Sequence, residues 1–140
     1  MAGIKFTHLD PTDFIKQGDV CYIEIPDVEG IHYMAIMNTD PQIQEVIVLG
    51  VLTTKIDKRK EFIRRNRMNP DSIVEFTYKK PSAIDCNTLH TIQKHTLFDK
   101  IRKGVFKISA PLPEEIVNRI IQGIIAGDAP QYLKKLVIHE

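Results

Sequence analysis

Runs of β-branched and aliphatic residues, separated by turn signals, fill the first half of the chain. Residues 19–25 and 31–37 form the first two runs, and the second ends at a turn signal, Asn-Thr-Asp-Pro, over residues 38–41. Residues 45–54 are almost all apolar, which is typical of a strand buried on both faces. The pattern therefore predicts three consecutive strands.

The later candidate strands are shorter or half polar. Residues 72–78 alternate between apolar and polar positions, which predicts one buried face that holds Phe76 and Tyr78. Residues 89–92 and 105–108 are short apolar runs of the same kind. With the first three runs, they bring the number of predicted strands to six.

One strongly amphipathic helix is predicted at residues 113–126. Pro113 suits a first helical turn, and Gly127 is a natural stop. Five isoleucines at helical spacing form one apolar face, which we expect to close the core of the sheet. They are Ile116, Ile120, Ile121, Ile124 and Ile125.

For two segments, the sequence allows more than one secondary structure. Residues 57–66 allow a short helix with Asp57 as its N-cap, or a mobile loop, because Phe62 and Ile63 are their only apolar contacts. The tail, residues 131–138, allows a last helical turn or a strand.

This order of elements predicts a mainly β (α+β) fold. We expect a small barrel or a curved antiparallel sheet with a C-terminal helix. A chain of 140 residues without repeats or linkers is expected to form a single domain over residues 1–140.

Composition and charge exclude some classes of protein. The chain is 43% hydrophobic and 26% charged with a net charge of +1, which excludes a globally basic nucleic-acid binder. Charge is nevertheless segregated, because residues 55–67 and 79–107 each carry seven basic side chains against two acidic ones. If these two segments converge, they form a phosphate-binding surface, and if they do not, they are ordinary solvated loops.

No cofactor or membrane segment is expected. The two cysteines, Cys21 and Cys86, are interpreted as small buried hydrophobic residues. The five histidines lack the spacing of a metal site, and no Gly-rich phosphate loop is present. Without a signal peptide or an apolar run of about 20 residues, the sequence predicts a cytoplasmic protein with no membrane partner.

The order of four stretches resembles the MazF/PemK-like family of toxins, which are small-barrel endoribonucleases paired with antitoxins. These stretches are residues 18–22, 46–54, 82–97 and 104–126, so that the match covers about residues 17–126. The resemblance implies an SH3-like barrel, a homodimer and metal-independent cleavage of single-stranded RNA through the ribose 2′-hydroxyl. It also implies an antitoxin protein whose disordered tail wraps the RNA groove.

The chain departs from the family pattern where the family places arginines. The family usually has an Arg before the second strand, whereas this chain reads Glu-Gly-Ile-His-Tyr over residues 29–33. The family's later Arg corresponds to His90. Thr53 stands at the position of the family's active-site threonine, and Glu29 lies near the position of its acidic residue.

Histidines at these positions suggest acid–base chemistry. Cleavage by the 2′-hydroxyl needs a base, an acid and a positive charge near phosphorus, and histidine, with an ordinary pKa of about 6.5, serves as base or acid at neutral pH. We therefore predict that His32 and His90 form an acid–base pair and that Thr53 donates a hydrogen bond to a phosphoryl oxygen. The predicted substrate-binding residues are Glu29, Thr54, Lys55, Lys58, Arg59, Arg64, Arg65 and Arg67.

Other interpretations stay open at this point. The chain is also consistent with a non-catalytic relative that has lost the arginines and binds a nucleic acid or a protein through its basic surface. A mobile-element accessory protein that keeps only the fold is a third possibility. His32 lies in an apolar run and has an ordinary interpretation as a packed or surface side chain, as Thr53 has as a strand threonine.

Overall fold

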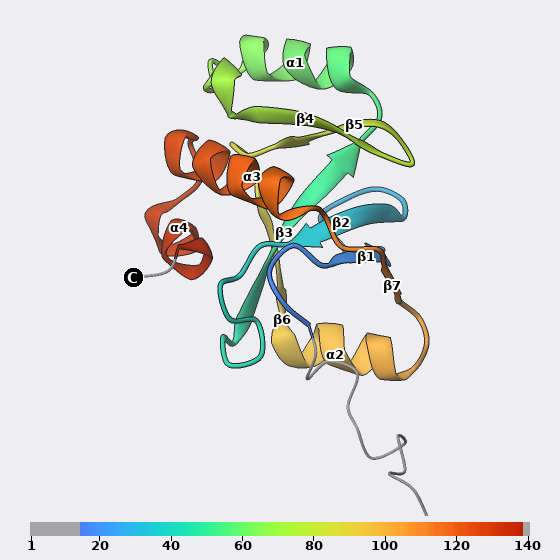
Figure 1. Ribbon diagram of the computed structural model, residues 1–140. Coiled ribbons are helices and arrows are strands. Elements are labelled where there is room, and N and C mark those ends of the chain that lie inside the picture. The colour runs from blue at the N-terminus through green and yellow to red at the C-terminus, as the bar shows by residue number, and fades with distance from the viewer. Residues whose placement is uncertain (1–14, 139–140) are drawn as a thin grey trace, which may run out of the picture.

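The computed structural model describes residues 15–138, which form one antiparallel sheet with helices packed on it (Figure 1). The elements are β1 (Val20–Ile23), β2 (His32–Ile36), β3 (Val46–Thr53), α1 (Ile56–Arg65), the 3-10 helix η3 (Pro70–Ser72), β4 (Ile73–Tyr78), β5 (Lys80–Asp85), β6 (His90–Gln93), α2 (Lys94–Arg102), β7 (Lys107–Ser109), α3 (Glu114–Ala126) and α4 (Gln131–Val137). In the part of the chain that the structure describes, no helix is long and apolar enough to cross a membrane.

Strand β3 lies at the centre of the sheet. The strand order is β4-β5-β3-β2-β1-β7, and β6 also pairs with β3. Leu49 pairs with Ile36 of β2 and with His90 of β6. Strand β6 pairs with residues 46–49 of β3, and β2 pairs with residues 49–51. The second half of β3 pairs with β5 through Leu52 and Thr53. Residues from β2, β5 and β6 thus meet around β3.

The sheet is curved but is not closed into a barrel. Its end strands, β4 and β7, share no backbone pairing. The Tyr78 hydroxyl bridges them, because it lies 2.7 Å from both the Ser109 hydroxyl and the Ala110 carbonyl oxygen. A phenol has one proton, so Tyr78 donates to the carbonyl and accepts from Ser109. The predicted α+β class, with an antiparallel sheet and a late helix, is confirmed, whereas the predicted barrel does not close, and the Tyr78 side chain links the two ends of the open sheet.

The two faces of the sheet carry separate cores. On one face, Val117, Ile120 and Ile124 of α3 pack with residues of α4 and the sheet. On the other face, α2 packs through Leu97 and Ile101. Strand β3 contributes to both cores, because successive strand side chains point to opposite faces, and its predicted double burial is confirmed.

Both cysteines are buried and free, as predicted. Burial raises the pKa of the Cys21 thiol to about 12 and that of the Cys86 thiol to about 12. Each thiol therefore stays protonated at neutral pH and packs as a small apolar group.

The structure contains elements that the pattern did not predict. Strand β5 begins with Lys80-Pro81, and a proline within a run argues against a strand. It is tolerated because this part of β5 pairs with β4 alone, while β3 pairs only farther along, at Ala83 and Ile84. Helix α2 has no side-chain cap, and its buried apolar residues follow only one short face.

Three predictions about helices were settled or corrected. Residues 56–65 form a helix rather than a loop, but its N-cap is Lys55 instead of Asp57. The tail is helical. The apolar face of α3 is rotated from the predicted one, because Val117 is buried whereas Ile125 is 41% exposed.

Candidate functional site

His32, Thr53 and His90 line one cavity of about 180 Å³. His32 is the first residue of β2, Thr53 the last of β3, and His90 the first of β6. The cavity has room for several water molecules or a group the size of a phosphate. Its complete lining is Val28, His32, Val51, Thr53, Arg59, Asp85, Thr88 and His90.

The register of the sheet explains why these side chains meet. Met34 pairs with Val51, so two residues farther along, His32 and Thr53 lie on the same face of neighbouring strands. His90 pairs with Leu49, which shares that face. All three side chains therefore lie on the face of the sheet that α2 covers, beyond the end of the hydrophobic core on that face.

Arg59 of α1 adds a cation to the cavity wall. Its Nε and Nη2 atoms lie 2.8 Å and 2.7 Å from the same Asp85 oxygen. The other Asp85 oxygen accepts the backbone N–H of Asn87 at 3.0 Å. The Arg59 guanidinium carbon also lies 4.1 Å from the centroid of the Phe62 ring. Asp85 and Phe62 thus fix the guanidinium, and Asp85 is 6% exposed.

A backbone carbonyl fixes the tautomer of His32. The Nε2 atom lies 2.7 Å from the Glu29 carbonyl oxygen. Because a carbonyl only accepts, Nε2 carries a proton, and Nδ1 is the ring atom that gains and loses one. The Glu29 side chain itself lines a different hollow, with Lys100 and Phe106, so the structure does not bring its carboxylate into the cavity.

The environment of His90 favours its neutral form. Burial lowers the pKa of His90 below its ordinary value of 6.5. The Asp27 carboxylate acts in the opposite direction and the Arg59 guanidinium in the same direction. At neutral pH, His90 is therefore an imidazole that can accept a proton.

A second hollow, of about 250 Å³, adjoins the cavity and carries two more cations. It is lined by Thr53, Lys55, Lys58, Arg59 and Phe62, and it shares Thr53 and Arg59 with the first. The Thr53 Oγ1 atom accepts the N–H of Lys55 at 3.1 Å, which leaves its hydroxyl proton to donate elsewhere. Within residues 15–138, neither Lys55 nor Lys58 forms an ion pair.

The remaining predicted binding residues lie elsewhere. Arg64 and Arg65 both pair with Glu61 on the exposed side of α1, and Arg67 follows that helix. Thr54 lines a hollow on the opposite face of the sheet. No lysine or arginine from the segment 79–107 lines either the histidine cavity or the adjoining hollow, so the two basic segments do not converge there.

Asp85 and Thr88 are members of the site that the sequence did not indicate. Both lie in or just after β5, the strand that the pattern failed to predict. The only signal for Asp85 in the sequence was its position directly before the buried Cys86. An acidic residue in an apolar setting usually has a charged partner.

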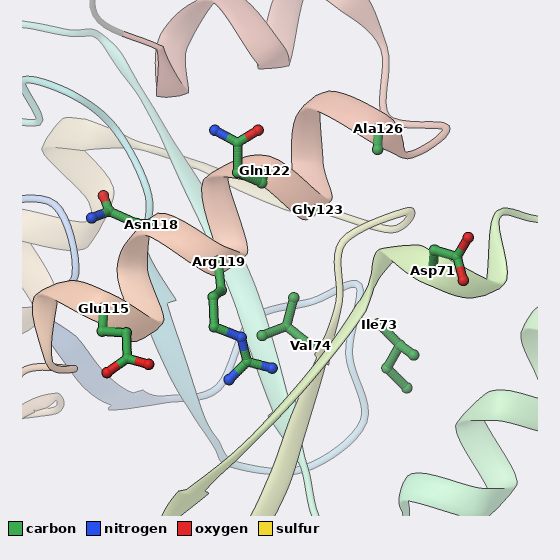
Figure 2. A pocket seen from close by; sticks show the side chains of 9 residues that line it. All are labelled: Asp71, Ile73, Val74, Glu115, Asn118, Arg119, Gln122, Gly123 and Ala126. Carbon is green, nitrogen blue, oxygen red and sulfur yellow. The ribbon is translucent and has the colours of Figure 1, made fainter.

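A larger hollow, of about 660 Å³, lies away from this site, between α3 and the start of β4 (Figure 2). Its polar side chains, which include Asp71, Glu115 and Arg119, are of mixed charge, and Arg119 extends toward Val74. No histidine, cysteine or serine lines it. The smaller cavity, which holds two histidines, is therefore the candidate site for acid–base chemistry.

Asp85→Asn tests the anchoring of Arg59. The amide keeps the shape but loses the charge of the acceptor, so we expect the free energy of unfolding to fall by about 1–2 kcal/mol in a urea titration. The matched control is Glu61→Gln, which removes a carboxylate from the exposed pairs with Arg64 and Arg65 and should cause no measurable change. Equal effects of the two substitutions would show that Asp85 anchors nothing.

Comparison with known proteins adds no identification. No protein-family model matches the chain, and no curated protein matches it significantly. Among residues 15–138, no group of three or more His, Cys, Asp or Glu side chains is placed to hold a metal ion.

Proposed function

We propose that this protein cleaves single-stranded RNA by attack of the ribose 2′-hydroxyl on the neighbouring phosphate, without a metal ion. One observation carries the proposal: two imidazoles, a hydroxyl and a guanidinium, each from a different element, line one small cavity. These are the groups that this reaction needs.

Each side chain has a role that fits its surroundings. His90, neutral at pH 7, takes the 2′-hydroxyl proton while the 2′ oxygen bonds to phosphorus. The bond from phosphorus to the 5′ oxygen breaks, and His32 gives that oxygen a proton from Nδ1. The products are a 2′,3′-cyclic phosphate and a 5′-hydroxyl. Thr53 donates to a phosphoryl oxygen, and Arg59 stabilises the added negative charge.

The cationic hollow beside the cavity suits the neighbouring phosphates of the strand. Lys55 and Lys58 line it with Phe62, whose side chain is 43% exposed. Lysines hold phosphates as point charges, and an exposed aromatic ring offers a surface for an unpaired base. The strand would therefore run from the cavity along the start of α1.

The resemblance to MazF/PemK-like toxins extends the proposal. The protein would act in the cytoplasm as a homodimeric toxin that a partner antitoxin with a disordered tail inhibits. The curved sheet, whose edge strands Tyr78 bridges, supports a relation to SH3-like barrels. In this relation Arg59 supplies, from α1, the positive charge that the family takes from its arginines.

The test is incubation of the purified protein with single-stranded RNA in EDTA, followed by analysis of the fragment ends. We expect fragments that end in a 2′,3′-cyclic phosphate, and no cleavage of DNA of the same sequence, which lacks the 2′-hydroxyl. Absence of fragments at a high ratio of protein to RNA would contradict the proposal. Binding without fragments would support the non-catalytic alternative instead.

The pH dependence of kcat/KM is expected to be bell-shaped. Below neutral pH the rate falls as His90 is protonated, and because burial lowers the pKa of His90, the midpoint of this fall lies below 6.5. The rate also falls at high pH, because a general acid must carry a proton when the 5′ oxygen leaves. A midpoint of the acidic limb above 6.5 would contradict the assignment of His90 as the base.

A further inference from the structure

A hollow of about 300 Å³ lies across the sheet from the histidine cavity. Tyr33 and Leu52 line it, and they are the strand neighbours of His32 and Thr53 in the cavity. Successive strand side chains point to opposite faces, so the two sites lie back to back at the same end of β2 and β3. Tyr78, Lys79, Lys80 and Thr54 complete most of its wall.

Three tyrosine rings form a cluster, and two of them, Tyr33 and Tyr78, line this hollow. The ring centroids of Tyr22 and Tyr33 are 4.7 Å apart, and those of Tyr33 and Tyr78 are 5.3 Å apart in an edge-on arrangement. The Tyr78 hydroxyl is held by Ser109 and Ala110, as described above. Rings that are already fixed lose little conformational entropy when a ligand stacks on them.

The charge of the hollow favours an anionic ligand. Lys79 and Lys80 line it, and no carboxylate does. The Lys79 Nζ atom lies 4.8 Å from the Tyr33 ring centroid and 2.9 Å from the Tyr33 hydroxyl. Two ammonium groups disfavour a cationic ligand, although tyrosine rings would otherwise attract one.

The backbone at Lys79 is strained at the tight turn between β4 and β5. Lys79 has a φ of 62°, a conformation that glycine adopts without cost and other residues rarely adopt. It forms the whole turn between β4 and β5, because Tyr78 pairs directly with Lys80. A strained residue that carries a functional side chain is typical of binding sites.

We propose that this tyrosine–lysine hollow binds an unpaired nucleobase of a single-stranded nucleic acid, with the base stacked on tyrosine and its phosphate on the lysines. Every base has a flat face that stacks on aromatic rings, and the phosphate supplies the negative charge. A volume at the lower end of ligand pockets suits one base rather than a larger ligand. The inference rests on the proposed function only for the identity of the strand as RNA.

The experiment uses the tyrosines as the probe. The chain has four tyrosines and no tryptophan, and the fourth, Tyr132, lies outside the cluster on α4 and is 67% exposed. In a Tyr132→Leu background, all fluorescence comes from the cluster. Titration with a single-stranded DNA oligonucleotide, which the protein cannot cleave, should quench it. An abasic oligonucleotide of equal length and charge should not.

Two variants separate stacking from a loss of folding. Tyr33→Leu should weaken oligonucleotide binding by about 5- to 150-fold, the range expected for one stacked base. Lys79→Gly should also weaken binding, while the melting temperature stays unchanged or rises because glycine relieves the strained φ. Binding that is unaffected in Lys79→Gly, or equal quenching by the abasic oligonucleotide, would overturn the proposal.

Base binding at this hollow and RNA cleavage at the histidine cavity can be tested separately. His32→Ala should keep the quenching in full, since His32 faces the other site. Quenching without any RNA cleavage would support this hollow and contradict the proposed nuclease. RNA cleavage without quenching would contradict this hollow alone.

Discussion

Replacement of His32 or His90 by alanine is expected to slow RNA cleavage by about 10²- to 10⁴-fold, the range for loss of a general acid or base. The two imidazoles line the same cavity, and each has an environment that suits its role. The affinity for RNA should change little, because Lys55, Lys58 and Arg59 remain. The measurement is single-turnover cleavage of one labelled RNA.

The matched control for this prediction is His95→Ala. His95 is exposed on α2 and does not line the cavity, so its loss should leave the cleavage rate unchanged. Wild-type rates in both the His32 and the His90 variants would exclude the acid–base pair. A rate loss in the His95 variant as large as in the others would point to a general effect on the fold.

Gly18→Ala is expected to lower the free energy of unfolding by about 2–4 kcal/mol, since it combines backbone strain with overpacking. Gly18 has a φ of +93°, and a Cβ there would lie 2.6 Å from Cγ2 of Val117 in α3. The backbone cannot move away easily, because Gly18 donates to Ile36 at 2.7 Å and accepts from Leu112 at 2.9 Å.

Gly104→Ala is the control that isolates the steric part of this loss. Gly104 has a φ of +73°, but a Cβ there would meet no atom within 4 Å. Its substitution adds backbone strain but no steric clash, so it should lower the free energy of unfolding by about 1 kcal/mol. Urea unfolding of both variants gives the comparison. Equal losses would mean that Gly18 does not hold α3 close to the sheet.

Much of the fold could be predicted because its signals are local. The apolar run at residues 46–54 and the isoleucines of residues 113–126 show their periodicity directly. Strand β5 was missed because Pro81 hides it, and pairing with β4 became visible only with the sheet order. The orientation of α3 depends on which side of the helix meets β4 and η3, and the five isoleucines did not determine that side.

The candidate site was predictable only in part. The resemblance to a family drew attention to His32, Thr53 and His90, and the structure brings them together. The sequence did not show which arginine would join them, because the segment 55–67 holds seven basic residues. The buried Asp85 selects Arg59, while Glu61 holds Arg64 and Arg65 away from the site.

The most direct test of a single catalytic cavity is the cleavage rate of the His32→Ala/His90→Ala double variant beside the two single variants. Groups that act together in one transition state give effects far from additive, so the double variant should be little slower than the slower single variant. A rate loss equal to the product of the two single losses would contradict one shared cavity, as would wild-type activity in the double variant.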